Sequence, residues 1–590
     1  MRAGMIRNLL LAVLLMSGLA AVSLKAAKPE SADPGLLEQS RYIDSFDGTR
    51  IAVSIFRPAR SGEPLPGPFP VIVTQDRSAR DERSGQARRY FVDHGHVVVA
   101  QDRRGTGASF GTQTGFVTSD DLRDAKAVIE WAAGQWFSTG AVGAMGCSNQ
   151  GVWQYGVAAL HPKGLKAIAP GCASPQFFDN AVTLNGVPMF PLKASYHHGA
   201  CPADPAGKPA RSDPSAQPRP VDADRDRALL REALETRGCT APMLGQYWLN
   251  MPRDGWNAFA LDRPAIDHSP ISHWREIAES GVAILQLGGW FDAAVAGQLQ
   301  GQRLWGGRLI MGPWVHGNRV PEGADFPEGE IDLHAETLRW FDHFLKGESN
   351  GEPRSGVQYY VLNARPGEEW RSVQSWPSDG GRKARFHLTD GVLSPGAPTA
   401  SAVSAEVQGE GVRWFDGKYA PLARWWNGDM AASDSRSLVH TTEPLPRDAE
   451  MTGTPVARLW IRSDASDLNV YAVIEDVAPD GRSSYVTDGR IRASWRALAP
   501  TPRGGVAENW HRGLAQDLLP LQQGEPTELV FDFFPIAYNF KAGHRIRVAL
   551  TTSIGEGYQQ PPSASGKVPT AELLGDAEHP SLLDLPLIGR

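Results

Sequence analysis

Residues 142–161 read V-G-A-M-G-C-S-N-Q-G-V-W-Q-Y-G-V-A-A-L-H, and this stretch points to the fold. Its apolar start predicts a short strand over 142–146, and its end predicts a helix over 152–161. The two would meet in a tight turn at Ser148, where the flanking residues must be small, as the glycines two before and three after it are. Gln150 departs from the strict G-x-S-x-G pattern. The turn predicts an exposed serine nucleophile, although an ordinary strand-to-helix turn would read similarly.

The same alternation of strands and helices continues on both sides of this turn. The run H-V-V-V-A-Q at 96–101 is almost wholly apolar, as in a parallel strand that is buried on both faces. Further strands are expected over 50–56, 71–74, 165–169, 282–287 and 309–311, and helices over 86–94, 120–133, 294–304 and 334–345. Repeated strand–helix–strand units predict the α/β class, with a doubly wound sheet that carries helices on both faces.

Two further motifs supply the partners that a serine nucleophile needs. G-G-W-F-D at 288–292 places Asp292 after one expected strand, and M-G-P-W-V-H-G at 311–317 places His316 after the next. Catalytic groups in open α/β sheets gather at the carboxyl ends of strands. Taken singly, Asp292 could cap a helix and His316 could be a loop residue. The chain order Ser, Asp, His is that of α/β-hydrolases, and the conjunction predicts this fold with catalytic Ser148, Asp292 and His316.

The residue types predict acyl transfer. A neutral serine hydroxyl is a poor nucleophile, so His316 would take its proton while Asp292 orients the imidazole. The backbone N–H of Asn149, directly after the serine, is expected to stabilise the oxyanion, with a second donor from the loop after residues 71–74. No cysteine or histidine group has the spacing of a metal site, so neither a metal nor a cofactor is expected.

The rest of the chain predicts two more regions. Residues 175–270 break the α/β rhythm with a Pro-rich centre and one helix over 225–236, which predicts a helical lid inserted above the sheet. After residue 350 come short alternating segments separated by turn residues, typical of a β-sandwich or jelly roll. The expected domains are therefore a catalytic domain of residues 28–174 and 271–350, a lid of 175–270, and a jelly roll of 351–590.

The first 27 residues are typical of a secretory signal peptide, with two arginines, an apolar run over 9–24 and small residues after it. The run is shorter than the roughly 20 residues of a spanning helix. Cleavage could follow Ser23 or fall within 26–27, and a retained anchor is the alternative. We expect export to the periplasm or the cell exterior, with no stable membrane insertion after processing.

Composition and cysteine content narrow the class of protein. A chain of 590 residues with 41% apolar residues is too long for one core, and its net charge of −7 is not concentrated in a block that would suggest nucleic-acid binding. Cys147 and Cys172 lie in apolar, strand-like surroundings and are expected to be buried free thiols. Cys201 and Cys239 lie in a Pro-, Asp- and Gly-rich stretch, and whether they pair is left open.

Several motifs together resemble one family of hydrolases. They are D-G-T-R-I-A-V-S-I-F-R-P at 47–58, A-Q-D-R-R-G-T-G at 100–107, the serine turn, G-G-W-F-D, G-P-W-V-H, V-T-D-G-R-I-R at 486–492, Y-N-F-K-A-G-H-R-I-R at 538–547 and H-P-S-L-L-D-L-P at 579–586. The chain resembles the family of bacterial cocaine esterases, α-amino-acid ester hydrolases, glutaryl acylases and X-prolyl dipeptidyl peptidases, most weakly across 175–270. The resemblance implies triad roles for Ser148, Asp292 and His316, and a C-terminal jelly roll.

Two positions depart from the family's pattern. Asn149 replaces a tyrosine after the nucleophile, which is tolerable because the expected oxyanion donor is a backbone N–H. Ser78 stands where relatives carry a tyrosine whose hydroxyl completes the oxyanion hole, so Ser78 becomes the candidate second donor, with a shorter reach. Ala293 and Ala294 follow Asp292 where the amino-acid ester hydrolases carry acids, which argues against recognition of a free α-amine by that route.

The favoured interpretation is a serine hydrolase that cleaves a small-molecule or peptide-like ester or amide through an acyl-enzyme. An X-Pro dipeptidyl aminopeptidase is the alternative within enzymes, and a catalytically silent binding protein is the alternative from another class. Assembly as a homo-oligomer is compatible with the sequence. In the expected lid, core packing is favoured over pocket lining for five residues: Tyr196, His197, His198, Trp248 and Trp256.

Overall fold

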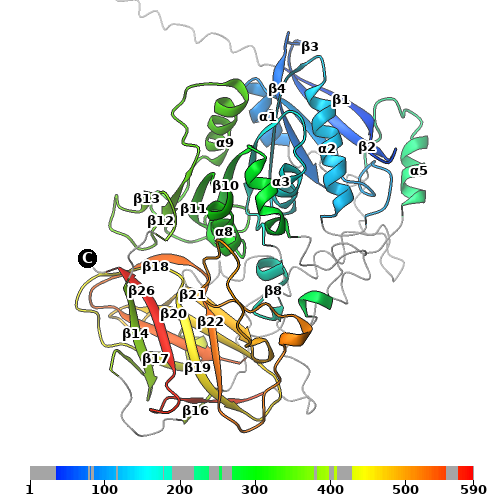
Figure 1. Cartoon of the computed structure of the whole chain (residues 1–590). Coiled ribbons are helices and arrows are strands. Elements are labelled where there is room, and N and C mark those ends of the chain that lie inside the picture. Colours follow the sequence, from blue (N-terminus) through cyan, green and yellow to red (C-terminus); the bar gives the residue numbers. More distant parts are fainter. Residues whose placement is uncertain are drawn as a thin grey trace, which may run out of the picture.

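The computed structural model describes residues 35–76, 80, 85–113, 117–176, 178–188, 218–237, 252–255, 269–377, 382–396, 404–407, 428–552 and 569–588. Two large sheets contain most of the strands in these ranges. The first is layered with helices, whereas the second, toward the C-terminus, has few helices near it (Figure 1). An α/β region followed by a region of mostly sheet was predicted, and at this level the prediction is confirmed.

The first sheet has eleven strands in the order β1-β2-β5-β4-β6-β7-β10-β11-β12-β13, with β3 beside β2. From β5 to β12 the neighbouring strands are parallel, and antiparallel pairings occur at both edges. Its strands are β1 (Gly35–Asp44), β2 (Arg50–Arg60), β3 (Glu63–Pro64), β4 (Phe69–Asp76), β5 (Val97–Asp102), β6 (Ser138–Cys147), β7 (Leu165–Gly171), β10 (Ala283–Phe291), β11 (Arg308–Val315), β12 (Gly356–Tyr360) and β13 (Trp370–Val373).

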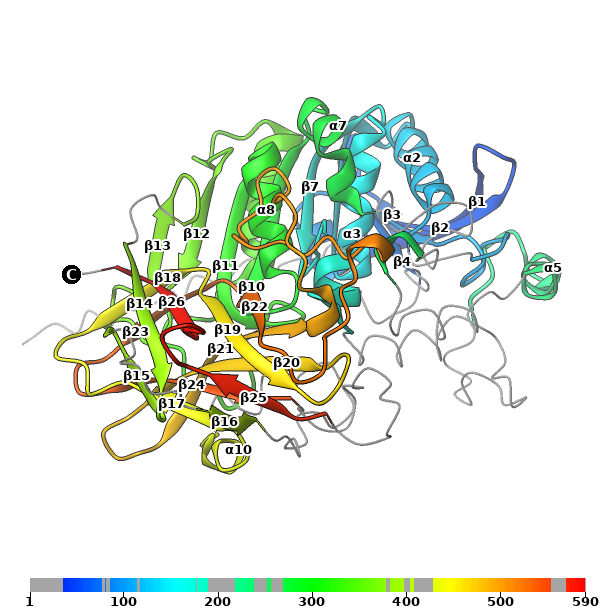
Figure 2. The same ribbon diagram turned by 60° about the horizontal axis from the view of Figure 1, so that its bottom comes forward.

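The central strands are apolar because helices cover both faces of this sheet. Along β4, Val71 and Val73 enter one hydrophobic core while Ile72 enters the other, as the period of two in a strand requires. Figure 2 shows helices of one layer side by side; they are α2 (Ser119–Ala133), α3 (Asn149–Ala159), α7 (Trp274–Glu279) and α8 (Val295–Trp305). Helices α1 (Gly85–Asp93) and α9 (Leu333–Phe341) pack on the opposite face. The doubly wound arrangement follows from this two-sided burial.

Helix α2 begins where the acidic residues of its first turn predict. The Thr118 side chain accepts a hydrogen bond from the N–H of Asp121, and the Asp121 carboxylate accepts one from the N–H of Thr118 at 2.8 Å. This reciprocal capping satisfies two backbone donors that the helix itself cannot pair. The helix is thereby held with its apolar side, including Val128 and Ile129, against the sheet.

The second sheet is a network of thirteen strands, antiparallel except where β15 meets β17. Its path is β16-β25-β19-β26-β14-β15-β17-β24-β20-β21, with β18, β22 and β23 joined to it at the side. The strands are β14 (Arg382–Thr389), β15 (Val392–Ser394), β16 (Ser404–Val407), β17 (Leu438–Thr441), β18 (Ala449–Gly453), β19 (Val456–Ser463), β20 (Asn469–Val477), β21 (Ser483–Arg492), β22 (Thr527–Asp532), β23 (Ile536–Phe540), β24 (Arg545–Thr551), β25 (Ala571–Leu574) and β26 (Leu582–Ile588). A short helix, α10 (Ala431–Asp434), precedes β17.

One expected strand belongs to a different sheet from the one predicted. Residues 356–360 fall in the region of 351–590 that was expected to form the jelly roll, but β12 pairs in parallel with β11 and so extends the first sheet, with β13 beside it. A short strand with alternating burial reads the same in either sheet, and its partners are set by tertiary contacts. The first sheet therefore continues to Val373, beyond residue 351.

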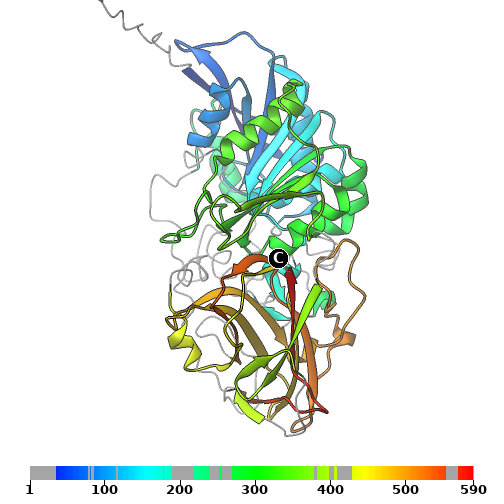
Figure 3. The ribbon, with the colours of Figure 1, turned by 90° about the vertical axis from the view of Figure 1, so that its left-hand side faces the viewer.

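The two sheets share a hydrophobic core where they meet. Trp290 and Leu299 of the α/β part pack in one cluster with Leu459 and Phe531 of the second sheet. The N–H of Leu362 also donates to the carbonyl of Ala537 at 2.9 Å. Figure 3 shows the two parts one above the other, joined along this contact.

The described pieces of the insertion lie between and beside the two sheets. Helix α5 (Ala228–Thr236) occupies the place predicted for a helix at 225–236, and β8 (Thr183–Leu184) pairs with β9 (Val187–Pro188). The proposed signal segment and the lid aromatics lie outside the described residues. Within the ranges described above, no helix is long and apolar enough to cross a membrane.

Candidate active site

The serine turn forms a strained elbow between β6 and α3. Ser148 has φ 62° and ψ −127°, a conformation that residues other than glycine rarely adopt. Its backbone N–H donates to the carbonyl of Gly171 at 2.9 Å, which fixes the turn against β7. A Cβ on Gly146 would come within 2.5 Å of Gln150 Cβ, and one on Gly151 within 2.4 Å of Ala173 Cβ. The predicted need for small residues at these two positions is confirmed.

Asp292 and His316 meet beyond the ends of two neighbouring parallel strands. Asp292 follows β10 and His316 follows β11, so the register of the pair brings them together. His316 Nδ1 lies 3.0 Å from Asp292 Oδ2, and the Asp292 side chain is only 4% exposed. Asp292 Oδ1 also accepts the N–H of Ala294 at 3.1 Å, just before α8, so the carboxylate serves the helix start as well.

The His316 imidazole lies at the elbow. One of its ring nitrogens, Cys147 Sγ and Cys172 Sγ all lie within 4.8 Å of one another, and Cys147 directly precedes Ser148. Because Asp292 engages Nδ1, the neutral ring would carry its proton there and leave Nε2 as the basic nitrogen. The structure therefore brings the three predicted residues to the same edge of the sheet.

The prediction that Cys147 and Cys172 are free thiols is wrong, because they form a disulfide. Cys147 ends β6, and its register partner on the parallel strand β7 is Gly171, directly before Cys172. The two Cα atoms are consequently 5.1 Å apart although 25 positions separate them in the chain. Only the pairing of β6 with β7 creates this proximity. Cys201 and Cys239 lie outside the described residues.

Burial and the neighbouring carboxylate act in opposite directions on His316. Burial lowers the pKa of His316, whereas the charge of Asp292 and the hydrogen bond to it raise the pKa, and the net effect is a pKa above the ordinary 6.5. The imidazole is thus a stronger base than a free histidine. This is the direction required of a group that accepts a proton from serine.

We expect the acid limb of the pH profile of kcat/KM to lie above pH 6.5, because only the neutral form of His316 can accept the proton. In the Asp292→Asn variant the charge that raises the pKa is lost, so the limb should move to lower pH while the rate falls. Ester hydrolysis followed from pH 4 to 9 with a fluorogenic substrate checks both. A limb that stays in place in the variant would contradict this account.

Asp76 is a hydrogen-bond partner of the elbow that the sequence analysis did not predict. It ends β4, and its carboxylate accepts hydrogen bonds from Asn149 Nδ2 at 3.3 Å and Gln150 Nε2 at 2.9 Å. The side-chain amides of these two residues thus tie the start of α3 to the end of β4. The acid at the end of an apolar strand was the available signal. Ser78, the candidate second oxyanion donor, lies outside the described residues.

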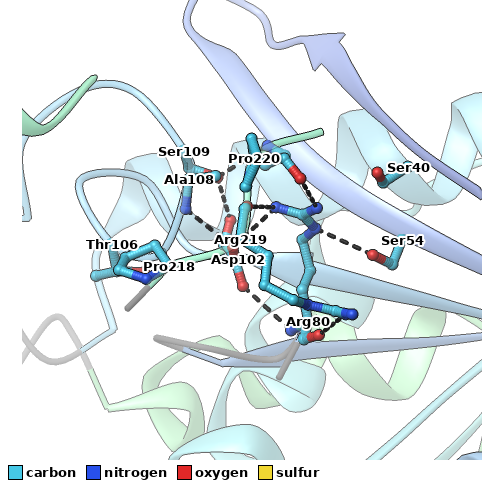
Figure 4. A network of polar contacts seen from close by, with 12 residues as sticks. Ser40, Ser54, Arg80, Asp102, Thr106, Ala108, Ser109, Pro218, Arg219 and Pro220 are labelled. Carbon is cyan, nitrogen blue, oxygen red and sulfur yellow. Dashed lines mark hydrogen bonds and ion pairs between the residues drawn. The ribbon is translucent and has the colours of Figure 1, made fainter. Parts of the chain in front are cut away.

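Arg80, in the loop after β4, is held by a buried network (Figure 4). Its Nη1 lies 3.6 Å from Asp102 Oδ2 with both side chains 4% exposed, its backbone N–H donates to Asp102 Oδ1, and its Nε donates to Ser54 Oγ. Its remaining donors reach the carbonyls of Arg219 at 2.9 Å and Pro220 at 3.1 Å, in the insertion. Arg80 therefore links the sheet to part of the insertion.

Comparison with known proteins agrees with this geometry. The sequence pattern of the X-Pro dipeptidyl-peptidase (S15) family matches residues 47–318, and that of the C-terminal non-catalytic domain of X-Pro dipeptidyl-peptidases matches residues 350–584. The chain belongs to the S15 family of serine hydrolases. The S15 pattern spans the three motifs at the elbow, at 288–292 and at 311–317. The chain is therefore a serine hydrolase.

Individual relatives of this S15-family chain are similar over almost their whole length. A Mycobacterium bovis protein provisionally named a serine esterase is 28% identical, over 94% of this chain and 96% of its own. The cocaine esterase of Rhodococcus sp. is 27% identical over 92% and 97%. A solved aminopeptidase from a Thaumarchaeota archaeon shares the fold, with a TM-score of 0.71 at 20% identity, over 96% and 98% of the two chains.

Proposed function

We propose that this serine hydrolase cleaves a carboxylic ester or amide through an acyl-enzyme on Ser148, with His316 as general base and Asp292 as the residue that orients it. The observation that carries the proposal is a single imidazole, held by Asp292 through Nδ1, that also lies at the elbow of Ser148. Ser148 Oγ attacks the carbonyl carbon while His316 takes its proton. The protonated imidazole then gives that proton to the leaving alcohol or amine, and water repeats the sequence on the acyl-enzyme.

The oxyanion would be stabilised at the start of α3. The N–H of Asn149 belongs to the first residue of this helix, where the backbone donors are not used within the helix and the helix dipole is positive. Ser78, which follows β4 in the chain, is proposed as the second donor. Each such donor typically lowers the barrier by about 2.7–4 kcal/mol.

An ester is the favoured substrate class. The Mycobacterium bovis and Rhodococcus relatives described above both carry esterase names. The residues directly after Asp292 are Ala293 and Ala294, so this segment has no carboxylate to hold a free α-amine. An X-Pro dipeptidyl aminopeptidase is the second candidate because the S15 pattern that matches the chain is named for that activity.

A labelling and substrate panel tests the proposal. We expect a fluorophosphonate probe to label Ser148 in the wild type and to leave the Ser148→Ala variant unlabelled. Ser174→Ala is the control and should still be labelled, because the Ser174 hydroxyl donates to the carbonyl of Gln176 at 2.9 Å in the wild type. Short-chain p-nitrophenyl esters should be cleaved faster than Gly-Pro anilides. Preference for the anilide would favour the peptidase, and absence of label on folded wild-type protein would favour a catalytically silent binding protein.

Several architectural features complete the proposal. The insertion of 175–270 would act as a lid, which is supported by its contacts with both parts: the carbonyls of Arg219 and Pro220 accept hydrogen bonds from Arg80, and the backbone N–H of Arg253 donates to the carbonyl of Gly513 at 2.8 Å. The largely antiparallel second sheet would be a jelly roll that begins near residue 382. We further propose that residues 1–27 direct export, and that no nucleic acid is a partner.

A further inference from the structure

A disulfide lies beside His316, the proposed general base. Cys147, Cys172 and His316 present two sulfurs and one ring nitrogen within 4.8 Å of one another. The mechanism uses the imidazole but has no role for either sulfur. We propose that reduction of the Cys147–Cys172 disulfide turns this centre into a binding site for a thiophilic divalent cation such as Zn²⁺, which takes His316 out of catalysis.

The spacing of the three atoms suits zinc. Zn–S bonds of about 2.3 Å and Zn–N bonds of about 2.0 Å place tetrahedral ligand atoms about 3.6–3.8 Å apart. The structure has all three atoms inside 4.8 Å, so small side-chain rotations suffice once the bond between the sulfurs is broken. Two thiolates and one imidazole would leave the fourth tetrahedral position for water.

The residue that orients His316 for catalysis would also orient it for a metal. Histidine ligands of metals usually donate their other ring N–H to a carboxylate, which fixes the tautomer. Asp292 Oδ2 already lies 3.0 Å from Nδ1, which makes Nε2 the nitrogen presented to the cation. The metal would therefore occupy the lone pair that must otherwise accept the serine proton, and this step of the proposal rests on the proposed role of His316.

Reduction frees the two sulfurs in two thiol–disulfide exchange steps. A thiolate of an external dithiol attacks Cys147 Sγ, since Cys147 is partly exposed whereas Cys172 is 2% exposed, and the Cys172 thiolate leaves. The second thiol of the reductant then displaces Cys147. The dithiol gives up two electrons and two protons and becomes a disulfide, while the protein gains two thiols. Binding of Zn²⁺ to both thiolates releases those two protons to the solvent.

The oxidised form would resist this inhibition. A disulfide sulfur has no thiolate charge to offer, so the cluster keeps only one good ligand, the imidazole. The bond between Cys147 and Cys172 thus protects the catalytic base from metal ions. Spacing in the sequence could not indicate this site, because its ligands come from the ends of three strands.

The test compares oxidised and reduced full-length protein. The reduced sample is treated with a phosphine and desalted without oxygen, and Co²⁺ serves as a spectroscopic probe. We expect the reduced wild type to bind one Co²⁺ with a thiolate-to-cobalt charge-transfer band, and one equivalent of Zn²⁺ to lower ester hydrolysis at least tenfold until EDTA restores it. The oxidised protein should show neither effect.

The Cys147→Ala/Cys172→Ala double variant is the matched control and is compared with its own metal-free rate. Zn²⁺ should leave that rate within twofold, and Co²⁺ should give no charge-transfer band. Reduced wild type alkylated with iodoacetamide replaces this control if the variant does not fold. Equal zinc inhibition in the control, or a reduced wild type without the cobalt band, would overturn the proposal. The cobalt spectrum needs no turnover, so it separates failure of this site from failure of the proposed function.

Discussion

Replacement of Ser148 by alanine is expected to lower kcat for ester hydrolysis by about 10⁵–10⁶-fold, because the attacking oxygen is lost. His316→Ala should cost a similar factor, since the imidazole proposed to accept the serine proton is lost. The two residues act as one unit, so the double variant should be no slower than either single variant. Steady-state kinetics with a p-nitrophenyl ester, on protein whose circular dichroism matches the wild type, measures all three.

Residual activity provides the control for this series. The oxyanion donors and the binding site remain in the Ser148→Ala variant, and such remnants sustain about 10³–10⁴-fold catalysis over water in other serine hydrolases. KM should therefore change little while kcat collapses. If the losses of Ser148 and His316 instead multiplied in the double variant, the two side chains would be acting independently, and the proposed proton transfer between them would be refuted.

Replacement of Arg80 by methionine is expected to lower the free energy of unfolding by about 3–5 kcal/mol, the usual cost of removing one partner from a buried ion pair. The methionine keeps much of the volume but leaves the Asp102 carboxylate without its cation. It also removes the donors that reach Ser54 and the carbonyls of Arg219 and Pro220. Urea unfolding monitored by tryptophan fluorescence measures the change.

Arg89→Met is the matched control for this substitution. Arg89 pairs with Asp93 at 2.7 Å one helical turn away, but both side chains are about one-third exposed, and such surface pairs are typically worth about 0–1 kcal/mol. The double variant Arg80→Met/Asp102→Asn should recover part of the lost stability because the buried charge is gone. Equal effects of Arg80→Met and Arg89→Met would mean that the buried network contributes no more to stability than a surface ion pair.

Local pattern sufficed for much of the fold and for the candidate triad. The strand that leads to Ser148, the helix after it and the two motifs ending at Asp292 and His316 are short-range features, and parallel strands always bring their carboxyl ends to one edge. The hydrogen bond between Asp292 and His316 follows from adjacency of β10 and β11, which consecutive βα units favour. Burial on both faces explains why the central strands could be recognised from composition alone.

The errors and omissions all concern partners distant in the chain. In the sequence Cys147 and Cys172 look like isolated thiols in apolar surroundings, and only the pairing of β6 with β7 brings them together as a disulfide. The segment that forms β12 could join either sheet, and only its pairing with β11 decides which. The spacing of Arg80, Asp102 and residues 218–220 in the sequence does not indicate that they form a network. Periodicity and motif order by themselves determined the α/β class and the candidate nucleophile, base and acid, because these depend on local burial and on the rule of strand ends. Only the tertiary structure decided the disulfide, the Arg80 network and the extent of the first sheet, because each depends on which distant segments become neighbours.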